Sequence, residues 1–148
     1  MCIRDSRRAL ESQTTASNNN AIGYEALWAT TTGDKNTAMV VQALLRNTAG
    51  FQNTAIGFEA GNYCTEGHHN TLIGVNAGDN ITTGDYNLVL GAGADPSSGT
   101  VDGECVLGEA NIGTLRCNTQ TISSLSDGRD KVEVEPSPLG VDLSLIHI

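Results

Sequence analysis

Residues 52–61 read QNTAIGFEAG, and seventeen residues later, residues 69–78 read HNTLIGVNAG. The motif recurs six times at a constant interval of 17 residues, with Val40 in place of its first glycine in the second copy. A short motif that repeats at a fixed period is typical of solenoids and other repeat arrays. The sequence therefore predicts an all-β fold, a parallel β-roll or β-solenoid of about six coils with 17 residues each.

Four columns of the repeat largely keep their residue type from copy to copy. The asparagine column is Asn19, Asn36, Asn53, Asn70 and Asn87, followed by Glu104 in the sixth copy. The residues that directly precede the first glycine position are Ile22, Met39, Ile56, Ile73, Leu90 and Leu107. The alanine column is Ala26, Ala43, Ala60, Ala77 and Ala94, followed by Asn111. A second glycine follows at Gly33, Gly50, Gly67 and Gly84.

Each motif begins with an alternating stretch that predicts a short strand. In NTAI, Thr54 and Ile56 are expected on one face of the strand, and Asn53 and Ala55 on the other. Both faces are apolar, so we expect one to fill the coil and the other to pack against another chain. A single coil stack is expected to leave one apolar face open to water, exemplified by Leu72, Val89 and Val106.

The stacking of coils predicts a ladder of asparagines. Neighbouring parallel strands lie about 4.8 Å apart, so each asparagine amide is expected to bond the amide of the next coil. After each strand, the first glycine permits a sharp bend. The segments YEAL (24–27) and QALL (42–45) are expected to form one helical turn there, and Val40 is expected to make its coil turn differently.

The composition fits a coil stack better than a compact globule. Aromatic residues make up 4% and charged residues 17% of the 148 residues, and the formal net charge is −9. An acidic chain without a basic patch is a poor partner for nucleic acid, and no apolar run approaches the length of a membrane span. A disordered linker rich in Gly, Asn and Thr is the alternative, against which the in-register apolar positions argue.

The cysteines and histidines predict no metal or cofactor site. Cys64, Cys105 and Cys117 match no zinc-binding or CxxC spacing, and we expect them to be unpaired. His68 and His69 precede one repeat, but neighbouring copies have Gln52 and Tyr86 at the place of His69. Loop polarity is therefore the preferred interpretation of the two histidines. The Gly-Asp pairs at 33–34 and 84–85 are interpreted as turns.

The repeats resemble those of known fibrous proteins. NNNAIGYEAL, QNTAIGFEAG and HNTLIGVNAG are similar to repeats of phage tail fibres and, more loosely, to the heads of trimeric autotransporter adhesins. The resemblance covers about residues 18–111. It implies that the chain forms one third of a homotrimeric shaft in a virion tail fibre or, alternatively, on a bacterial cell surface. It also implies attachment to a cell-surface receptor or glycan.

A second resemblance concerns residues 121–142, TISSLSDGRDKVEVEPSPLGVD. They resemble the start of the intramolecular chaperone domain of tail spikes and endosialidases, through Ser126, Asp127, Arg129, Lys131, Val134, Leu139 and Gly140. The resemblance implies that the parent protein is a self-cleaving enzyme with Ser126 as nucleophile and Lys131 as general base, although this truncated piece is not expected to be active. Without the resemblance, Ser126 is more simply interpreted as a turn cap and Lys131 as a solvated charge.

The two termini resemble the translated strands of a transposase-type sequencing adapter. LSLIHI at the end is the translation of CTGTCTCTTATACACATC, and the reverse complement of that string encodes the opening MCIRD. We therefore expect residues 1–6 and 143–148 to be artefacts on an open-ended piece of a longer gene. The predicted organisation is an N-terminal flank at 7–17, the solenoid at 18–111, a linker at 112–125 and the truncated chaperone domain at 126–142.

Overall fold

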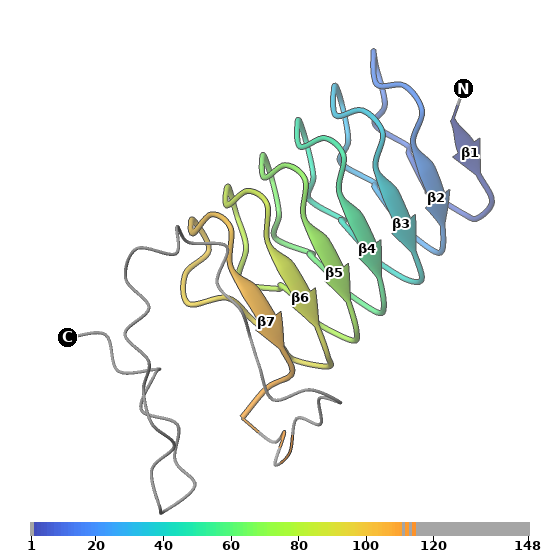
Figure 1. The fold of residues 1–148 in the computed structure, drawn as a ribbon. Coiled ribbons are helices and arrows are strands. Elements are labelled where there is room, and N and C mark those ends of the chain that lie inside the picture. Colours follow the sequence, from blue (N-terminus) through green and yellow to red (C-terminus); the bar gives the residue numbers. More distant parts are fainter. Residues whose placement is uncertain (1, 111, 113, 115–148) are drawn as a thin grey trace, which may run out of the picture. The chain divides into compact units, whose positions relative to one another are not determined.

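The computed structural model describes residues 2–110, 112 and 114, which form a parallel β-solenoid (Figure 1). Its single sheet has seven strands in chain order, all parallel. The strands are β1 Ile3–Arg4, β2 Asn20–Ile22, β3 Thr37–Met39, β4 Thr54–Ile56, β5 Thr71–Ile73, β6 Leu88–Leu90 and β7 Cys105–Leu107. Each strand begins 17 residues after the previous one, which confirms the predicted coil length.

The register of the sheet follows the sequence repeat. Ile56 lies beside Ile73, and Thr54 beside Thr71, as the repeat predicts. The solenoid begins earlier than the predicted start at residue 18, because β1 pairs with β2 through Ile3 and Asn20. The predicted N-terminal flank at 7–17 thus follows the coil path as well.

The inward face of the strands is the face that we expected to be open to water. The central residue of β2 to β6 is fully buried: Ala21, Ala38, Ala55, Leu72 and Val89. Val106 in β7 is partly buried and packs against the same core. The prediction that Leu72, Val89 and Val106 face water is therefore wrong. They line the coil interior on the same side of the strands as the buried asparagines, and the Thr/Ile side faces outward.

The interior keeps its volume by exchanging large and small residues between strand and turn. In the coils of β2 and β3, the strand contributes alanine and the turn contributes Leu27 or Leu44, both fully buried. At β5 the strand residue becomes Leu72, and the turn residue on each side becomes Gly61 or Gly78. A Cβ atom at Gly61 would lie 2.6 Å from Leu72 Cδ1, and one at Gly78 would lie 2.7 Å from Leu72 Cδ2. In a close-packed interior, the larger strand residue Leu72 therefore requires the smaller turn residues Gly61 and Gly78.

The turn after each strand is not helical, contrary to the expectation for YEAL and QALL. In the coil of β2, the Ala26 N–H donates to the Gly23 carbonyl and the Trp28 N–H to the Glu25 carbonyl, each at 3.2 Å. Glu25 and Leu27 have φ values of 58° and 51°. Left-handed residues at alternate positions make successive β-turns. The intervening Leu27 N–H donates to the Ala43 carbonyl of the next coil, so the backbone pairs between coils instead of along a helix.

The asparagine ladder is present, but its bonds differ from the predicted amide-to-amide bonds. The backbone N–H of Asn70 donates to Oδ1 of Asn53 at 2.9 Å. The Nδ2 of Asn53 donates to the carbonyl of Gly67 at 2.7 Å. The same pair of bonds recurs at Asn19, Asn36, Asn70 and Asn87. Each buried side chain therefore binds the backbone of the following coil.

Val40 follows the same path as the glycines of its column. Its N–H donates to the Ile22 carbonyl at 2.7 Å, as the Gly57 N–H donates to the Met39 carbonyl at 3.1 Å. The φ value of Val40 is 90°, against 148° for Gly57. A β-branched residue in this region is strained. The expectation that this coil turns differently is thus only partly met, because the hydrogen bond is kept at a strained dihedral angle.

Candidate functional site

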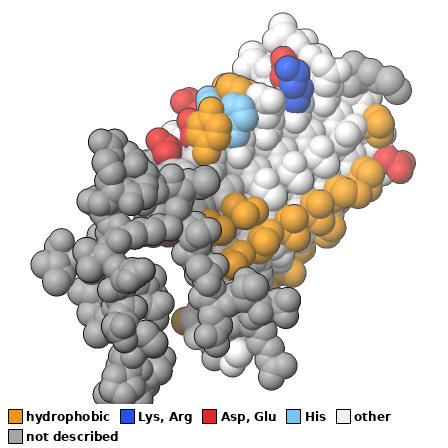
Figure 2. Space-filling view, viewed as in Figure 1, with side chains coloured by type: hydrophobic (Ala, Val, Ile, Leu, Met, Phe, Trp, Pro, Cys, Tyr) orange, Lys and Arg blue, Asp and Glu red, His pale blue; other side chains and the backbone are white. Residues whose placement is uncertain are grey.

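The outward side chains of β2 to β7 form a continuous surface that we call the outer strand face. It consists of the first and third residue of each strand: Asn20, Ile22, Thr37, Met39, Thr54, Ile56, Thr71, Ile73, Leu88, Leu90, Cys105 and Leu107. Ile22 and Ile73 are each 39% exposed, and Leu107 is 47% exposed. Figure 2 shows hydrophobic side chains in a row along the solenoid.

A second apolar column widens this surface beyond the first glycine. Tyr24, Phe58 and Val75 stand two residues after the third residue of their strands, and they are 40%, 43% and 51% exposed. The two apolar columns are in register, because every coil has the same length. Scattered exposed hydrophobic residues are ordinary on protein surfaces, but a contiguous apolar stripe marks an interaction site.

The outer strand face carries no charged side chain among its twelve members. The solvated face of a sheet is usually polar, yet none of the chain's 25 Lys, Arg, Asp and Glu residues stands on this one. The face also has a ridge every coil, at the ~4.8 Å spacing of paired strands. It is therefore suited to burial against a surface with matching periodicity.

Aromatic rings stack at a different corner of the coils, which the sequence did not predict. Phe51 stacks on His68 with ring centroids 3.9 Å apart, and His69 stacks on Tyr86 at 4.6 Å. The edge of Phe51 also contacts His69 at 5.2 Å. The signal was present in the sequence, because Phe51 and His68, and likewise His69 and Tyr86, are each 17 residues apart. The two histidines thus join neighbouring coils.

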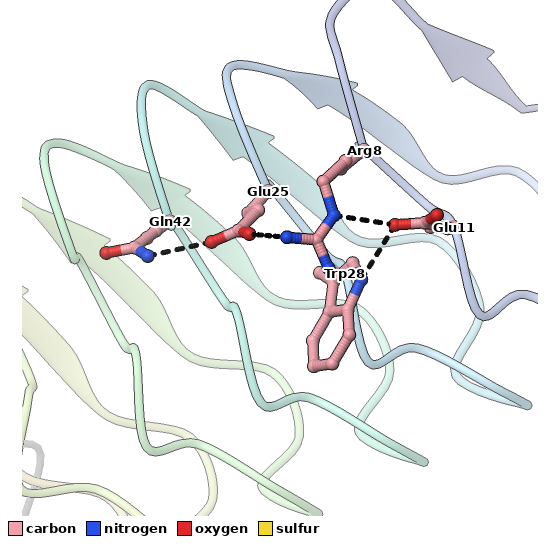
Figure 3. Close-up of polar contacts among 5 residues, drawn as sticks. All are labelled: Arg8, Glu11, Glu25, Trp28 and Gln42. Carbon is pink, nitrogen blue, oxygen red and sulfur yellow. Dashed lines mark hydrogen bonds and ion pairs between the residues drawn. The ribbon is translucent and has the colours of Figure 1, made fainter.

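A polar cluster ties the first coil to the next two (Figure 3). Arg8 forms ion pairs with Glu11 at 2.9 Å and with Glu25. Trp28 Nε1 donates to Glu11 at 3.0 Å, and Gln42 Nε2 donates to Glu25 at 2.8 Å. The pKa of Glu11 is lowered first by its bond from Arg8, and that of Glu25 first by its bond from Gln42. Each acid is therefore held in its charged form between coils.

The described cysteines differ sharply in accessibility. Cys64 is fully buried, and desolvation raises the pKa of its thiol to about 12. Cys105 is exposed on the outer strand face, and both cysteines are free thiols. A buried neutral thiol is unreactive because the thiolate is the nucleophile. Cys105 is thus the accessible thiol of the outer strand face, while Cys117 lies outside the described residues.

The structure does not bear on the predicted catalytic pair, because Ser126 and Lys131 lie outside the described residues. Within the described part of the chain, no group of three or more His, Cys, Asp or Glu residues is placed to hold a metal ion. The same residues contain no helix that is long and apolar enough to cross a membrane.

The fold assigns the described residues to the parallel β-solenoids, a class defined by architecture. Comparison with protein-family models, with curated proteins and with solved structures finds no match to the chain. Function must therefore be argued from the surface of the solenoid.

Proposed function

We propose that the solenoid is a segment of a structural and adhesive shaft, in which three copies of the chain cover one another's outer strand face. The observation that carries the proposal is the uncharged apolar stripe along β2 to β7. Burial of such a stripe stabilises an assembly by about 25 cal/mol for each Å² of apolar surface removed from water. A shaft that binds a receptor or glycan through other surfaces uses this face only for assembly.

A further copy of the same chain is the partner that fits this face best. The apolar residues recur once per coil, so a rigid partner meets all of them only if its own ridges have the same spacing. Another copy of the chain has that spacing, because its coils are the same. Closed cyclic symmetry then covers the stripe on every copy without leaving an open end. The repeat resemblance to trimeric fibres favours three copies.

A phage tail fibre or tail spike is the preferred setting, and the head of a bacterial trimeric surface adhesin is the alternative. Both use the same assembly, so the outer strand face favours neither. The disordered-linker alternative does not fit the solenoid formed by the described residues. Neighbouring reading frames in the parent genome distinguish the two settings, since phage tail genes beside this one support the tail fibre.

Cys105 provides a direct test of the assembly. In a Cys2→Ser/Cys117→Ser background, Cys64 is buried and Cys105 is the exposed thiol on the face. A short bifunctional thiol reagent is expected to join chains covalently under native conditions, with no product after Cys105→Ser. Absence of cross-linked chains, with Cys105 still reactive toward a small monofunctional reagent, contradicts a shared face.

We further propose that the intact parent cleaves itself beside Ser126, with Lys131 as the base. This proposal rests on the motif in residues 121–142. A lysine accepts a proton near neutral pH only when burial or a nearby cation lowers its pKa. We therefore expect this truncated chain to be inert. On a denaturing gel the parent should give two pieces, whereas Ser126→Ala and Lys131→Ala should each stay whole. Cleavage that persists in Ser126→Ala rules out the dyad.

A further inference from the structure

The two ends of the coil stack are not equivalent, and three features distinguish the end at β7. They lie in the second glycine column, in the asparagine column and in the turn after the last strand. In every interior coil each of these places makes close contact with the coil that follows. At β7 all three depart from the pattern.

The second glycine of each repeat leaves room for the next coil. A Cβ atom at Gly50 would lie 2.5 Å from the carbonyl oxygen of Gly67, and one at Gly67 would lie 2.6 Å from that of Gly84. The column ends at Val101, one period after Gly84. By the geometry of the column, we infer that its β-branched side chain takes the space that the next carbonyl would need. Ala16 occupies this column in the first coil, so a single methyl group is compatible with stacking there. The two additional carbons of Val101 are the difference.

The asparagine column ends at Glu104. The N–H of Glu104 still donates to Asn87 Oδ1 at 2.9 Å, so the last interior bond of the ladder is complete. Its own side chain turns back instead, and Oε2 accepts from the N–H and the Oγ of Ser97 at 3.0 and 2.8 Å. An asparagine would offer an acceptor and a donor to the next coil. A carboxylate has no donor to offer.

The turn after β7 covers the place of a following coil. A Cβ atom at Gly91 would lie 2.8 Å from Cα of Gly108, which belongs to the next coil. A Cβ atom at Gly108 would instead meet the side chain of Ile112, with Cδ1 at 2.8 Å. The Ile112 N–H donates to the Glu109 carbonyl at 2.9 Å, which closes the turn. A side chain of the same chain thus stands where another coil would stack.

We propose that β7 is built as the last coil, and that Val101, Glu104 and Ile112 close this end of the solenoid to a further coil and to the strand edge of a second copy. An unpaired strand edge otherwise templates the addition of another chain, and terminal units of repeat proteins generally need a distinct cap. The closed end confines self-association to the outer strand face.

The test inserts one extra coil, a copy of residues 74–90, at two places in the full chain. Between Ile73 and Gly74 the copy lies among ordinary coils, and we expect its amides to be as protected from hydrogen exchange as those of β5. Between Leu107 and Gly108 the copy must stack on Val101 and Glu104. There we expect its amides to lose that protection, as measured by mass spectrometry of peptides from the insert.

The matched variant replaces the two residues that prevent stacking and leaves the inserted coil unchanged. With Val101→Gly and Glu104→Asn, the copy after Leu107 should regain the protection of the interior copy. Protection of that copy in the unaltered background would overturn the proposal. Failure of the double substitution to restore protection would overturn it as well. The readout is independent of the number of chains in the assembly, so it is separate from the test of the proposed trimer.

Discussion

The buried asparagine column shows how single polar residues hold neighbouring coils together. Asn53 is 1% exposed, yet its side chain accepts from the Asn70 N–H and donates to the Gly67 carbonyl. Without Asn53 the Asn70 N–H would be buried without a bond, and the Gly67 carbonyl would keep only the weak thiol donor of Cys64 at 3.8 Å. Poorly satisfied buried groups of this kind destabilise a fold. Aspartate has no amide donor and alanine has neither group, so only the amide serves both partners here.

Asn53→Ala should therefore destabilise the solenoid by about 1–3 kcal/mol, since it leaves the Asn70 N–H without a partner and the Gly67 carbonyl with only the Cys64 thiol. Urea unfolding of the two proteins measures the difference. Thr54→Ala, at the adjacent half-buried outward position, is the control and should have a much smaller effect. Equal effects of the two substitutions would mean that the ladder bonds do not hold the coils together.

Val40 and Gly57 occupy the same place in successive coils, and we expect exchanging their residue types to change stability in opposite directions. Val40→Gly removes a strained left-handed valine, and we expect a gain of up to about 1 kcal/mol after the entropy of glycine in the unfolded chain is subtracted. Gly57→Val introduces that strain and places side-chain atoms against the Gly74 carbonyl. We expect this substitution to lower the free energy of unfolding by more than about 3 kcal/mol. Thermal unfolding measures both variants. A lower melting temperature for Val40→Gly would contradict the claim that Val40 is strained.

At the scale of the element, each strand has one face inside its coil and one face outside. The sequence predicted the strands, their register and the coil length, because a period of 17 residues persists through six copies. Alternation alone did not decide which apolar face points inward, since both faces carry apolar residues. The inward position of Leu72 depends on the space left by the missing side chain of Gly61. That relation cannot be read from the strand alone, because the two residues come from separate parts of neighbouring coils.

Adjacent residues in β5 test the inward and outward assignment. Leu72→Ala should leave a cavity in the coil and cost about 2–5 kcal/mol of unfolding free energy. Ile73→Ala should cost far less in the unassociated chain, because Ile73 is 39% exposed. Chemical denaturation at low protein concentration compares the two. A larger effect of Ile73→Ala under those conditions would reverse the assignment of the faces.

The turns and corner contacts were less predictable than the strands. The sequence YEAL fits one helical turn by its residue types. The four N–H groups of a single helical turn have no partner within the turn, and in that conformation they would not bond to the next coil either. Alternating left-handed residues, such as Glu25 and Leu27, let the N–H groups bond between coils. The aromatic pairs are explained by the same spacing, because rings one period apart are brought face to face.

At the scale of the whole molecule, the described coils combine a closed end with an uncharged apolar side. The fold itself is established by the register of the seven strands, whereas the trimer is argued from the stripe on the outer strand face. The sequence analysis expected Leu72, Val89 and Val106 to be open to water, whereas these residues belong to the coil interior. The predicted catalytic pair, Ser126 and Lys131, belongs to a different part of the chain and does not depend on this surface.

Sedimentation equilibrium of the parent protein, which carries the complete chaperone domain, and of two single variants of it tests the outer strand face most directly. Ile73→Lys places a charge at the centre of that face. Tyr86→Lys is the matched control, because Tyr86 is 65% exposed off the face and Lys35 already stands in the same column. We expect a trimer for the unaltered parent and for Tyr86→Lys, and a folded monomer for Ile73→Lys. A stable, soluble monomer of the unaltered parent, or a trimer that survives Ile73→Lys, would contradict the account.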